Sequence, residues 1–549
     1  MIKIYFLVLL LLNYILNEET YEGAHTLVLK DGESTIDGQS LSETPSLGVS
    51  IHAGENIIHY EREYADVSGY GEATEENEKH SAEDCNKEKL VKISESGTYI
   101  VSGSLKGQLS VELSSNTDSN LFVTLVLNSV NINCTVAPGL IFYKAYEIDS
   151  IDYEDSGNVI SYTKANDLNF DNAGAKIIIA DGSTNTVTGS HVAKCYKYTK
   201  NDDGSITMTT DKRAKYDGAL YSKVSMLIKG ETNENGILNI IADNEGLNSE
   251  KHLLVESGNI NIASQDDGIN TNEDNGSVTL IKGGTLTINA GLGSEGDGID
   301  SNGYLIINGG TIISAAKPVS DSGMDADLGV VINGGTVVGV GSNMEGASST
   351  SSQPTMNLKF SSQISKNSNL VIKDSSENIL LTFNPSSSGF VENTDIRTYQ
   401  GAILSHPSFK LNEVYYLYLD DTQLGYNGQR GQNMPGNPPV NNGNNNPGNP
   451  PDNGNNNDNP GTPPDNGGQN NNNDNPGTPP NNGGNNNNQS TNTGSMSKKF
   501  TLTSTATTFN GVSVYSESNY SNNSGSYIKT FGYLFGFLGI LLLFLILIK

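Results

Sequence analysis

Residues 281–315 read IKGGTLTINAGLGSEGDGIDSNGYLIINGGTIISA, and this stretch contains two copies of one pattern. A glycine pair opens a short run that alternates polar or small residues with Leu or Ile, and an acidic Asp-Gly turn lies between the two runs. Alternation with a period of two is typical of a β-strand with one buried face. The runs are too short and too β-branched for helices, and glycine stands where the backbone must turn. The stretch therefore predicts short strands joined by tight turns.

The pattern recurs along residues 217–345. Strand openings lie 26, 26 and 25 residues apart, at Gly258, Gly284, Gly310 and Gly335. The acidic turns follow at less regular intervals of 28, 22, 30 and 25 residues, as expected if loops of varying length leave that edge. One repeat cannot bury its apolar face alone, so neighbouring repeats must stack in register. The sequence predicts an all-β solenoid of the parallel β-helix type.

Stacking would align the acidic turns in a column with the strand spacing of about 4.8 Å. The segment 217–345 carries 18 Asp and Glu residues against 5 Lys and no Arg, so its carboxylates must repel one another. Oxygen donors suit Ca²⁺, whereas zinc is a poor candidate here because His252 is the only histidine and cysteine is absent. Asp-Gly pairs are also good turn formers in their own right, but their recurrence favours calcium. The candidate ligands are Asp217, Glu245, Asp266, Asp267, Asn270, Asp297, Asp300, Asp325 and Asp327.

The charge of the whole chain limits its partners. With 62 acidic and 32 basic residues, the formal charge is −30, which argues against nucleic acid or an anionic membrane surface as a direct partner. Tryptophan, the commonest platform for stacking on sugars, is absent. Tyr216, Tyr221 and Tyr304 are candidate substitutes, although such tyrosines more often serve ordinary strand packing.

Composition divides the chain into segments. Residues 1–17 resemble a secretory signal peptide, and residues 530–548 are long and apolar enough either to span a bilayer or to signal a lipid anchor. The Asn/Gly/Pro-rich stretch 426–498 predicts a disordered stalk that holds a folded head away from the membrane, on the outside of the cell. The remaining predicted segments are a polar N-terminal segment 21–90, the β-helix 91–347, its β cap 348–425 and a polar juxtamembrane segment 499–529. Cys85, Cys134 and Cys195 allow one disulfide and one odd thiol, in any of three pairings.

The repeated Asp-Gly-Ile-Asp/Asn turns, together with Ile-Asn-Gly-Gly-Thr strands, resemble the secreted carbohydrate-binding β-helix family of plant-cell-wall-degrading clostridia. The resemblance covers roughly residues 90–420 and implies a right-handed parallel β-helix that binds calcium and acidic plant polysaccharide, notably polygalacturonate, without catalysis. The positions that match the family's calcium ligands are Asp217, Asp267, Asp297, Asp300 and Asp325. The chain departs from the pattern at Glu245, Asn248, Asn270 and Ser322, and we expect those repeats to bind calcium weakly or not at all.

The leading hypothesis is a cell-surface, non-enzymatic protein that binds an acidic polysaccharide through Ca²⁺. A calcium-dependent lyase on the same fold is an alternative, because fold alone does not decide function. A lyase needs a basic residue to abstract a proton, and the repeats offer only lysines such as Lys223, Lys251 and Lys282. A hydrolase would need a carboxylate pair, and Asp266 with Asp267 resembles one only superficially. The third alternative is an adhesin without a sugar ligand, in which calcium only stiffens the repeats.

Overall fold

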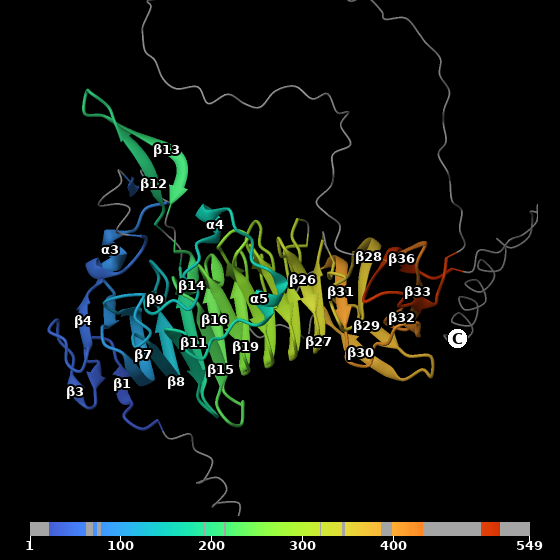
Figure 1. The fold of residues 1–549 in the computed structure, drawn as a ribbon, viewed down its shortest axis with the longest axis horizontal. Coiled ribbons are helices and arrows are strands. Elements are labelled where there is room, and N and C mark those ends of the chain that lie inside the picture. Colours follow the sequence, from blue (N-terminus) through green and yellow to red (C-terminus); the bar gives the residue numbers. More distant parts are fainter. Residues whose placement is uncertain are drawn as a thin grey trace, which may run out of the picture. The chain divides into compact units, whose positions relative to one another are not determined.

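The fold is nearly all β, with one large mixed sheet and one small three-stranded sheet (Figure 1). The computed structural model describes residues 21–61, 70–73, 78–190, 193–213, 216–318, 320–342, 346–385, 398–431 and 496–516. These residues all belong to one compact unit. The predicted signal peptide 1–17, most of the predicted stalk 426–498 and the predicted anchor 530–548 lie outside them. Within the described ranges, no helix combines the length and the apolar character that crossing a membrane requires.

Most of the large sheet consists of three ladders, each a series of strands paired in parallel. The first ladder contains β8 (Val123–Asn133), β10 (Ala175–Ile179), β15 (Met226–Gly230), β18 (His252–Val255), β21 (Val278–Ile281), β24 (Tyr304–Ile307) and β26 (Gly329–Ile332). The second ladder also starts at β8. It then contains β11 (Thr184–Gly189), β16 (Ile237–Ala242), β19 (Asn259–Ser264), β22 (Thr285–Asn289), β25 (Thr311–Ala315) and β27 (Thr336–Gly341). The third ladder contains β6 (Lys89–Ile93), β7 (Gly97–Glu112), β9 (Leu140–Lys144), β14 (Gly218–Ser222), β17 (Glu245–Ser249), β20 (Ile269–Thr271) and β23 (Ile299–Ser301).

From β14 to β25 the chain passes through the third, first and second ladders in turn, so each pass adds one strand to every ladder. The strand openings predicted from the glycine pairs at residues 283–284 and 309–310 lie directly before β22 and β25, in paired register. The predicted repeat is therefore present as a stack of equivalent strands.

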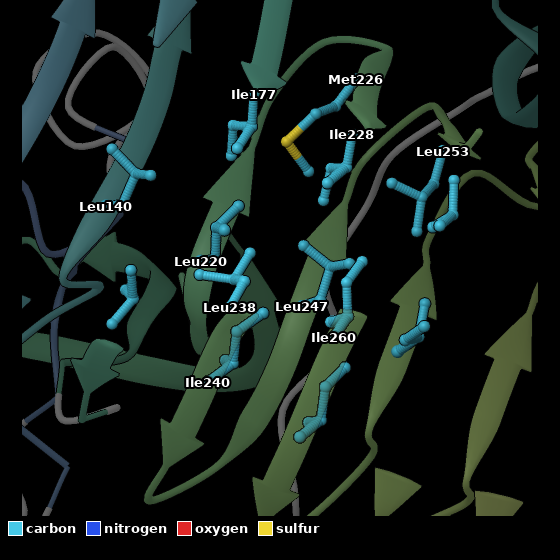
Figure 2. Close-up of a cluster of buried hydrophobic side chains, with 14 of the residues drawn as sticks. Leu140, Ile177, Leu220, Met226, Ile228, Leu238, Ile240, Leu247, Leu253 and Ile260 are labelled. Atoms are coloured by element: carbon cyan, nitrogen blue, oxygen red, sulfur yellow. The ribbon is translucent and has the colours of Figure 1, made fainter. Parts of the chain in front are cut away.

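Aligned apolar columns hold the passes together (Figure 2). Ile240, Ile262 and Ile288 are direct partners in the second ladder, and each is fully buried. Burial of one such side chain contributes about 1.5–3 kcal/mol. A shift of one residue would turn the whole column outward, so the core fixes the register of every ladder.

The backbone conformation explains why glycine recurs in these pairs. Gly284, Gly310 and Gly335 each adopt a positive φ, of 85°, 91° and 93°. A Cβ at Gly310 would lie 2.8 Å from the carbonyl oxygen of Gly284, and a Cβ at Gly335 would lie 2.7 Å from that of Gly310. Glycine recurs here because the turn needs left-handed backbone and because successive turns stack closely.

The N-terminal segment differs from its prediction. Residues 21–90, predicted to be polar and weakly patterned, contain β1 (His25–Leu29), which pairs in parallel with β7, and β4 (Val49–Ala53), which pairs with β6. Leu27 and Leu29 enter the main core. The described part of this segment therefore belongs to the folded domain.

Short elements lie outside the three ladders. They are β2 (Thr35–Ile36), β3 (Gln39–Ser40), η1 (Gly54–Asn56), α3 (Ala82–Cys85), α4 (Tyr153–Ser156) and α5 (Tyr162–Asn166). The small sheet joins β5 (Tyr70–Glu72), β12 (Cys195–Lys200) and β13 (Ile206–Arg213) in antiparallel order.

An antiparallel cap ends the stack. β27 pairs with β31 (Tyr399–Ser405), and β31 also pairs with β28 (Thr355–Ile364). A hairpin within the cap consists of β29 (Leu370–Lys373) and β30 (Ile379–Phe383). The cap also contains β32 (Val414–Leu419), β33 (Thr422–Gly425) and β34 (Gly428–Gly431).

The cap extends beyond its predicted end at residue 425. β35 (Phe500–Thr501) pairs with β32, and β36 (Ala506–Val514) pairs with β28, β33 and β34. Phe500 and Phe509 are fully buried, with ring centroids 5.0 Å apart. The prediction of a polar juxtamembrane segment at 499–529 is therefore wrong for its first part, because these aromatic side chains complete the core of the cap.

Candidate functional site

The acidic turns lie at the third ladder, where the register brings their side chains into columns. Asn248, Asn270 and Asp300 are direct partners on β17, β20 and β23. Glu245 and Asp267 each stand three residues earlier, as does Asp297. We call these six residues the acidic stripe.

Backbone hydrogen bonds confirm that the turns themselves are stacked. Gly246 N–H donates to the carbonyl oxygen of Asp267 (2.9 Å), and Gly268 N–H donates to that of Asp297 (2.9 Å). Gly298 N–H continues the series to Ser322 (2.9 Å). The turn at Ser322 is therefore the next member of the same series.

Asp217 does not fit the predicted column. Gly218, rather than Asp217, is the register partner of Glu245, so Asp217 lies one residue out of step. Its carboxylate is buried and accepts a hydrogen bond from the Asn244 amide at 3.0 Å.

Side chains within the stripe also contact one another. The Asp267 carboxylate accepts a hydrogen bond from the backbone N–H of Asp297 at 2.7 Å, and the Asp297 carboxylate accepts one from Ser322 N–H at 2.5 Å. The Asn270 amide nitrogen donates to Glu245 and to Asp267, both at 3.3 Å. Its carbonyl oxygen Oδ1 is buried and accepts no hydrogen bond in the structure. An acceptor oxygen left in this state, among carboxylates, is suited to a cation.

Burial, reinforced by the charges of neighbouring carboxylates, shifts the titration of three residues of the stripe, Asp267, Asp297 and Asp300. Burial, and then the charges of Glu245 and neighbouring aspartates, hold the pKa of Asp267 well above its usual range. Burial and the nearby charge of Asp325 raise the pKa of both Asp297 and Asp300 to about 7. The charged forms of Asp267, Asp297 and Asp300 are therefore disfavoured. At neutral pH these carboxyl groups favour either a proton or a bound cation.

The remaining predicted ligands lie at the edges of the stripe. Asp325 N–H donates to the carbonyl oxygen of Ile299 at 2.8 Å, and Asp327 N–H donates to that of Ser301 at 3.0 Å, so both follow β23 in the stack. Asp325 is partly buried, whereas Asp327 is exposed. The charge of Asp266 contributes to the raised pKa of Asp267.

One further acidic residue was missed. Asp321 accepts a hydrogen bond from Gly296 N–H at 2.9 Å, and its charge contributes to the raised pKa of Asp297. The sequence contained a signal for it in the turn Asp321-Ser322-Gly323. In the other turns the acidic residue directly precedes the glycine, whereas here Ser322 separates the two.

Two of the three lysines considered for a lyase, Lys223 and Lys251, are engaged in ion pairs. Lys251 contacts the buried carboxylate of Glu273, and Lys223 contacts the buried carboxylate of Glu61. Burial lowers the pKa of Lys223. These contacts hold both ammonium groups against carboxylates of the protein and do not favour the lyase alternative.

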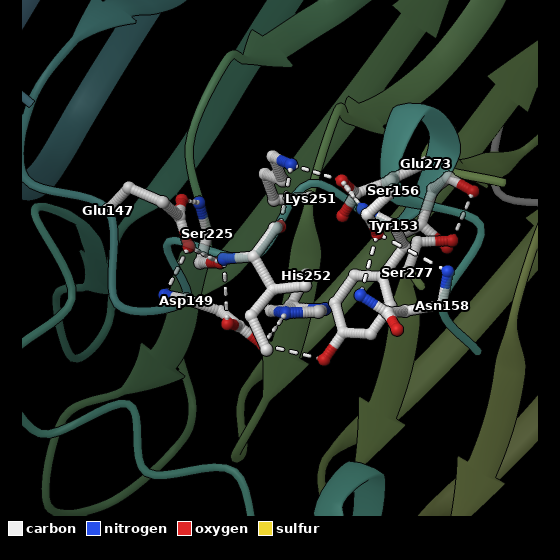
Figure 3. A network of polar contacts seen from close by, with 12 residues as sticks. Glu147, Asp149, Tyr153, Ser156, Asn158, Ser225, Lys251, His252, Glu273 and Ser277 are labelled. Carbon is white, nitrogen blue, oxygen red and sulfur yellow. Dashed lines mark hydrogen bonds and ion pairs between the residues drawn. The ribbon is translucent and has the colours of Figure 1, made fainter. Parts of the chain in front are cut away.

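Lys251 belongs to a polar network beside β18 (Figure 3). In it Lys164 contacts the Asp149 carboxylate at 2.5 Å, and the Nε2 atom of the fully buried His252 lies 3.5 Å from that carboxylate. Burial alone would raise the pKa of Asp149, but hydrogen bonds with His252 and Lys164 outweigh it and hold the pKa below its usual range. Asp149 and Glu273 therefore each have a lysine partner in this network.

Two of the three tyrosines suggested as sugar platforms are not available for stacking. Tyr216 and Tyr221 are buried, with ring centroids 4.7 Å apart, and their hydroxyls donate to Glu61 and Glu250. Tyr304 is partly exposed and lies edge-on to Tyr162.

Comparison with known proteins gives one family and one solved structure. A family of carbohydrate-binding domain-containing proteins matches residues 87–176 and 156–384, which together make up more than half of the chain. A polysaccharide lyase-like protein from C. thermocellum, solved as a gadolinium derivative, shares 20% sequence identity, with 57% of this chain and 92% of that chain covered. Its TM-score of 0.30 is too low to support a conclusion about this chain. No curated protein matches. On the extent of the family match, the chain belongs to the carbohydrate-binding domain-containing proteins.

Proposed function

We propose that this protein is a cell-surface carbohydrate-binding protein that recognises an acidic polysaccharide of the polygalacturonate (pectin) type through bound Ca²⁺. The observation that carries the proposal is the acidic stripe, in which burial and neighbouring carboxylates raise the pKa of Asp297 and Asp300, in a chain of a carbohydrate-binding family.

The donor chemistry of the stripe fits calcium. Its six side chains offer only carboxylate and amide oxygens, the ligands that a hard cation such as Ca²⁺ prefers. The amide oxygen of Asn270 is already positioned without a hydrogen-bond donor. Asp300, the register partner of Asn270 on the next strand, would supply a carboxylate, and Glu245 and Asp267 lie within hydrogen-bond distance of the Asn270 amide.

The net charge of the chain makes a metal bridge necessary for an acidic ligand. A protein with a formal charge of −30 repels a polyuronate at long range. A bound Ca²⁺ reverses the local charge and can share its coordination between protein and uronate carboxylates. The stripe residues hold their oxygens in a row at the strand spacing, which suits a polymer with one carboxylate per sugar.

The architecture fits presentation outside the cell. We propose that the three ladders close into a right-handed parallel β-helix, since the chain passes through them in the same order from β14 to β25. Residues 1–17 would direct secretion, and residues 530–548 would anchor the chain to the membrane as a helix or through an exchanged lipid. The stretch 432–495 would then act as a stalk.

The test is a pull-down of the full chain on insoluble polygalacturonate, with Ca²⁺ and with a chelator. We expect binding only with Ca²⁺, and at least tenfold weaker binding for Asp300→Asn. Asp202→Asn is the matched control, because it removes the same charge from an exposed position on the β12–β13 hairpin. Equal binding in chelator would refute the calcium bridge. Calcium-dependent stability without binding to any acidic glycan would instead favour the adhesin alternative.

A further inference from the structure

A second cluster of metal-ligand side chains lies far from the acidic stripe in sequence. His59, His80 and Cys85 each offer one ligand atom, and these three atoms all lie within 4.8 Å of one another. The Cys85 Sγ atom is 3.5 Å from His59 Nε2, and the two imidazole rings are stacked with centroids 4.6 Å apart. We call these three residues the His–Cys cluster. It precedes residues 87–384, which match the carbohydrate-binding family, so the family does not account for it.

Outer contacts orient both imidazoles. The Nδ1 atom of His59 lies 3.1 Å from the carbonyl oxygen of Val136, and Nδ1 of His80 lies 2.7 Å from a carboxylate oxygen of Glu72. In metal sites, a histidine ligand almost always donates its second ring N–H to a carbonyl or a carboxylate, which fixes the tautomer and the ring orientation. Both histidines have this arrangement at Nδ1, which leaves Nε2 as the ligand atom.

The backbone around the cluster is held closely. Cys85 ends α3, whose first turn is capped by the Ser81 hydroxyl, which accepts a hydrogen bond from Asp84 N–H. A Cβ at Gly54 would lie 1.6 Å from the carbonyl oxygen of Cys85, so only glycine allows η1 to approach α3 this closely. Cys85 is buried against Ile57 in a small apolar cluster. The thiol is thus fixed in position before any ion binds.

All three cysteines are buried free thiols in the structure, so the one disulfide that the sequence allows is not formed. Cys134 contacts the buried carboxylate of Glu88, with Sγ 3.2 Å from the oxygen. Cys85 instead faces an imidazole. The two thiols therefore have different environments, and only Cys85 has ligand-type neighbours in the His–Cys cluster.

We propose that His59, His80 and Cys85 bind one divalent transition-metal ion of the Zn²⁺ class. Thiolate and imidazole are the ligands that such ions prefer over Ca²⁺. In a tetrahedral zinc site, the usual bond lengths place sulfur and nitrogen ligands about 3.6 Å apart. The observed separation of 3.5 Å between Cys85 Sγ and His59 Nε2 agrees with this value. On binding, the thiol loses its proton to solvent and the sulfur forms the bond to the metal.

An access path is present as well. A cavity of about 250 Å³ adjoins the cluster and is lined by Glu55, Asn56, Ile57, His59, Tyr60 and His80. With three protein ligands, a fourth position would face this cavity and take water. Through Glu72 on β5, the bound ion would tie the η1–α3 region to the small sheet.

The test is a Co²⁺ titration of the metal-stripped full chain, followed by absorbance spectroscopy. We expect one Co²⁺ per chain, with a thiolate-to-cobalt charge-transfer band that Zn²⁺ abolishes and that excess Ca²⁺ leaves unchanged. Cys85→Ser should remove the band, and His80→Gln should weaken Co²⁺ binding by at least ~10–100-fold, the loss that follows removal of even an outer-shell partner. Cys134→Ser is the matched control, a second buried thiol that should leave the band intact.

Cobalt binding without a thiolate band, or with a band that survives in Cys85→Ser, would overturn the proposal. Circular dichroism establishes that each variant is folded. If Cys85→Ser does not fold, His80→Gln decides the question, because His80 is partly exposed and its replacement leaves the apolar packing intact. Unchanged cobalt affinity in His80→Gln would then reject the site.

Discussion

Replacing Asp300 by asparagine should stabilise the calcium-free protein at neutral pH. Asp300 follows Asn270 and Asn248 in the same column, so an amide at this position repeats what its neighbours already have. Burial and nearby carboxylates raise the pKa of Asp300 from 3.8 to about 7. A shift of this size corresponds to a penalty of up to about 4 kcal/mol for the charged carboxylate. Asparagine fills the same space without the charge.

The direction of the pH dependence follows from the raised pKa. The folded state holds the Asp300 proton more tightly than the unfolded chain, so this group contributes stability below its unfolded pKa of 3.8. That contribution falls as pH rises towards about 7, and Asp297 behaves in the same way. In chelator, the native protein should therefore lose apparent unfolding free energy between pH 4 and pH 8, and Asp300→Asn should lose less.

Urea denaturation at pH 5 and pH 8, in chelator and in Ca²⁺, measures both effects. Calcium should stabilise the native protein more than Asp300→Asn, because the variant lacks one carboxylate ligand. At pH 8 the order of stability should thus reverse between chelator and calcium. Asp202→Asn serves as the control for a change of net charge. If Asp300→Asn is neutral or destabilising in chelator and keeps the native pH dependence, repulsion in the stripe is not the governing interaction.

Two further substitutions test the packing and the ion-pair network. Gly268→Ala would place a Cβ 2.2 Å from Ile288 Cγ2 and 2.4 Å from the carbonyl oxygen of Gly298, so we expect it to lower stability by about 1–3 kcal/mol in thermal denaturation. Gly428→Ala, which meets only an ordinary contact at 3.9 Å, should change little. Asp149→Asn should cost about 1–2 kcal/mol at pH 7, because it removes the charged partner of Lys164, whose side chain is partly exposed and stays solvated. Because the pKa of Asp149 is lowered, its contribution exists above the unfolded value of 3.8, so the difference from the native protein in urea denaturation should shrink as pH falls below that value.

The repeat was predictable because its cause is local. The glycine pair, the alternating strand and the acidic turn recur within each pass, and their intervals match the register of the second and third ladders. A one-residue offset at Asp217 was harder to predict, since only the register of β14 against β17 reveals it. Local patterns therefore predicted the stack of strands and the acidic stripe, but not the offset of Asp217 from it.

The rest depended on long-range pairing. Ala506, at the start of β36, pairs with Thr355, although about 150 residues separate them, and no local pattern identifies such a partner. The alternation Phe500-Thr501-Leu502 was visible, but its place between the low-complexity stretch and the apolar C-terminal stretch led to the prediction of a polar juxtamembrane segment. The His–Cys cluster follows no regular spacing, because segments that lie apart in sequence bring its side chains together.

The core and the acidic stripe are coupled by register. Each pass fixes its position through buried columns such as Ile240, Ile262 and Ile288, which cannot slip by one residue without turning outward. The same register sets the distance between the turn carboxylates, so Asp267 and Asp297 cannot move apart to relieve their repulsion. Their charge must then be balanced by protons or by a cation. A fold of this kind sets repeated acidic turns in a row, and the spacing of that row is the strand spacing of the sheet, about 4.8 Å.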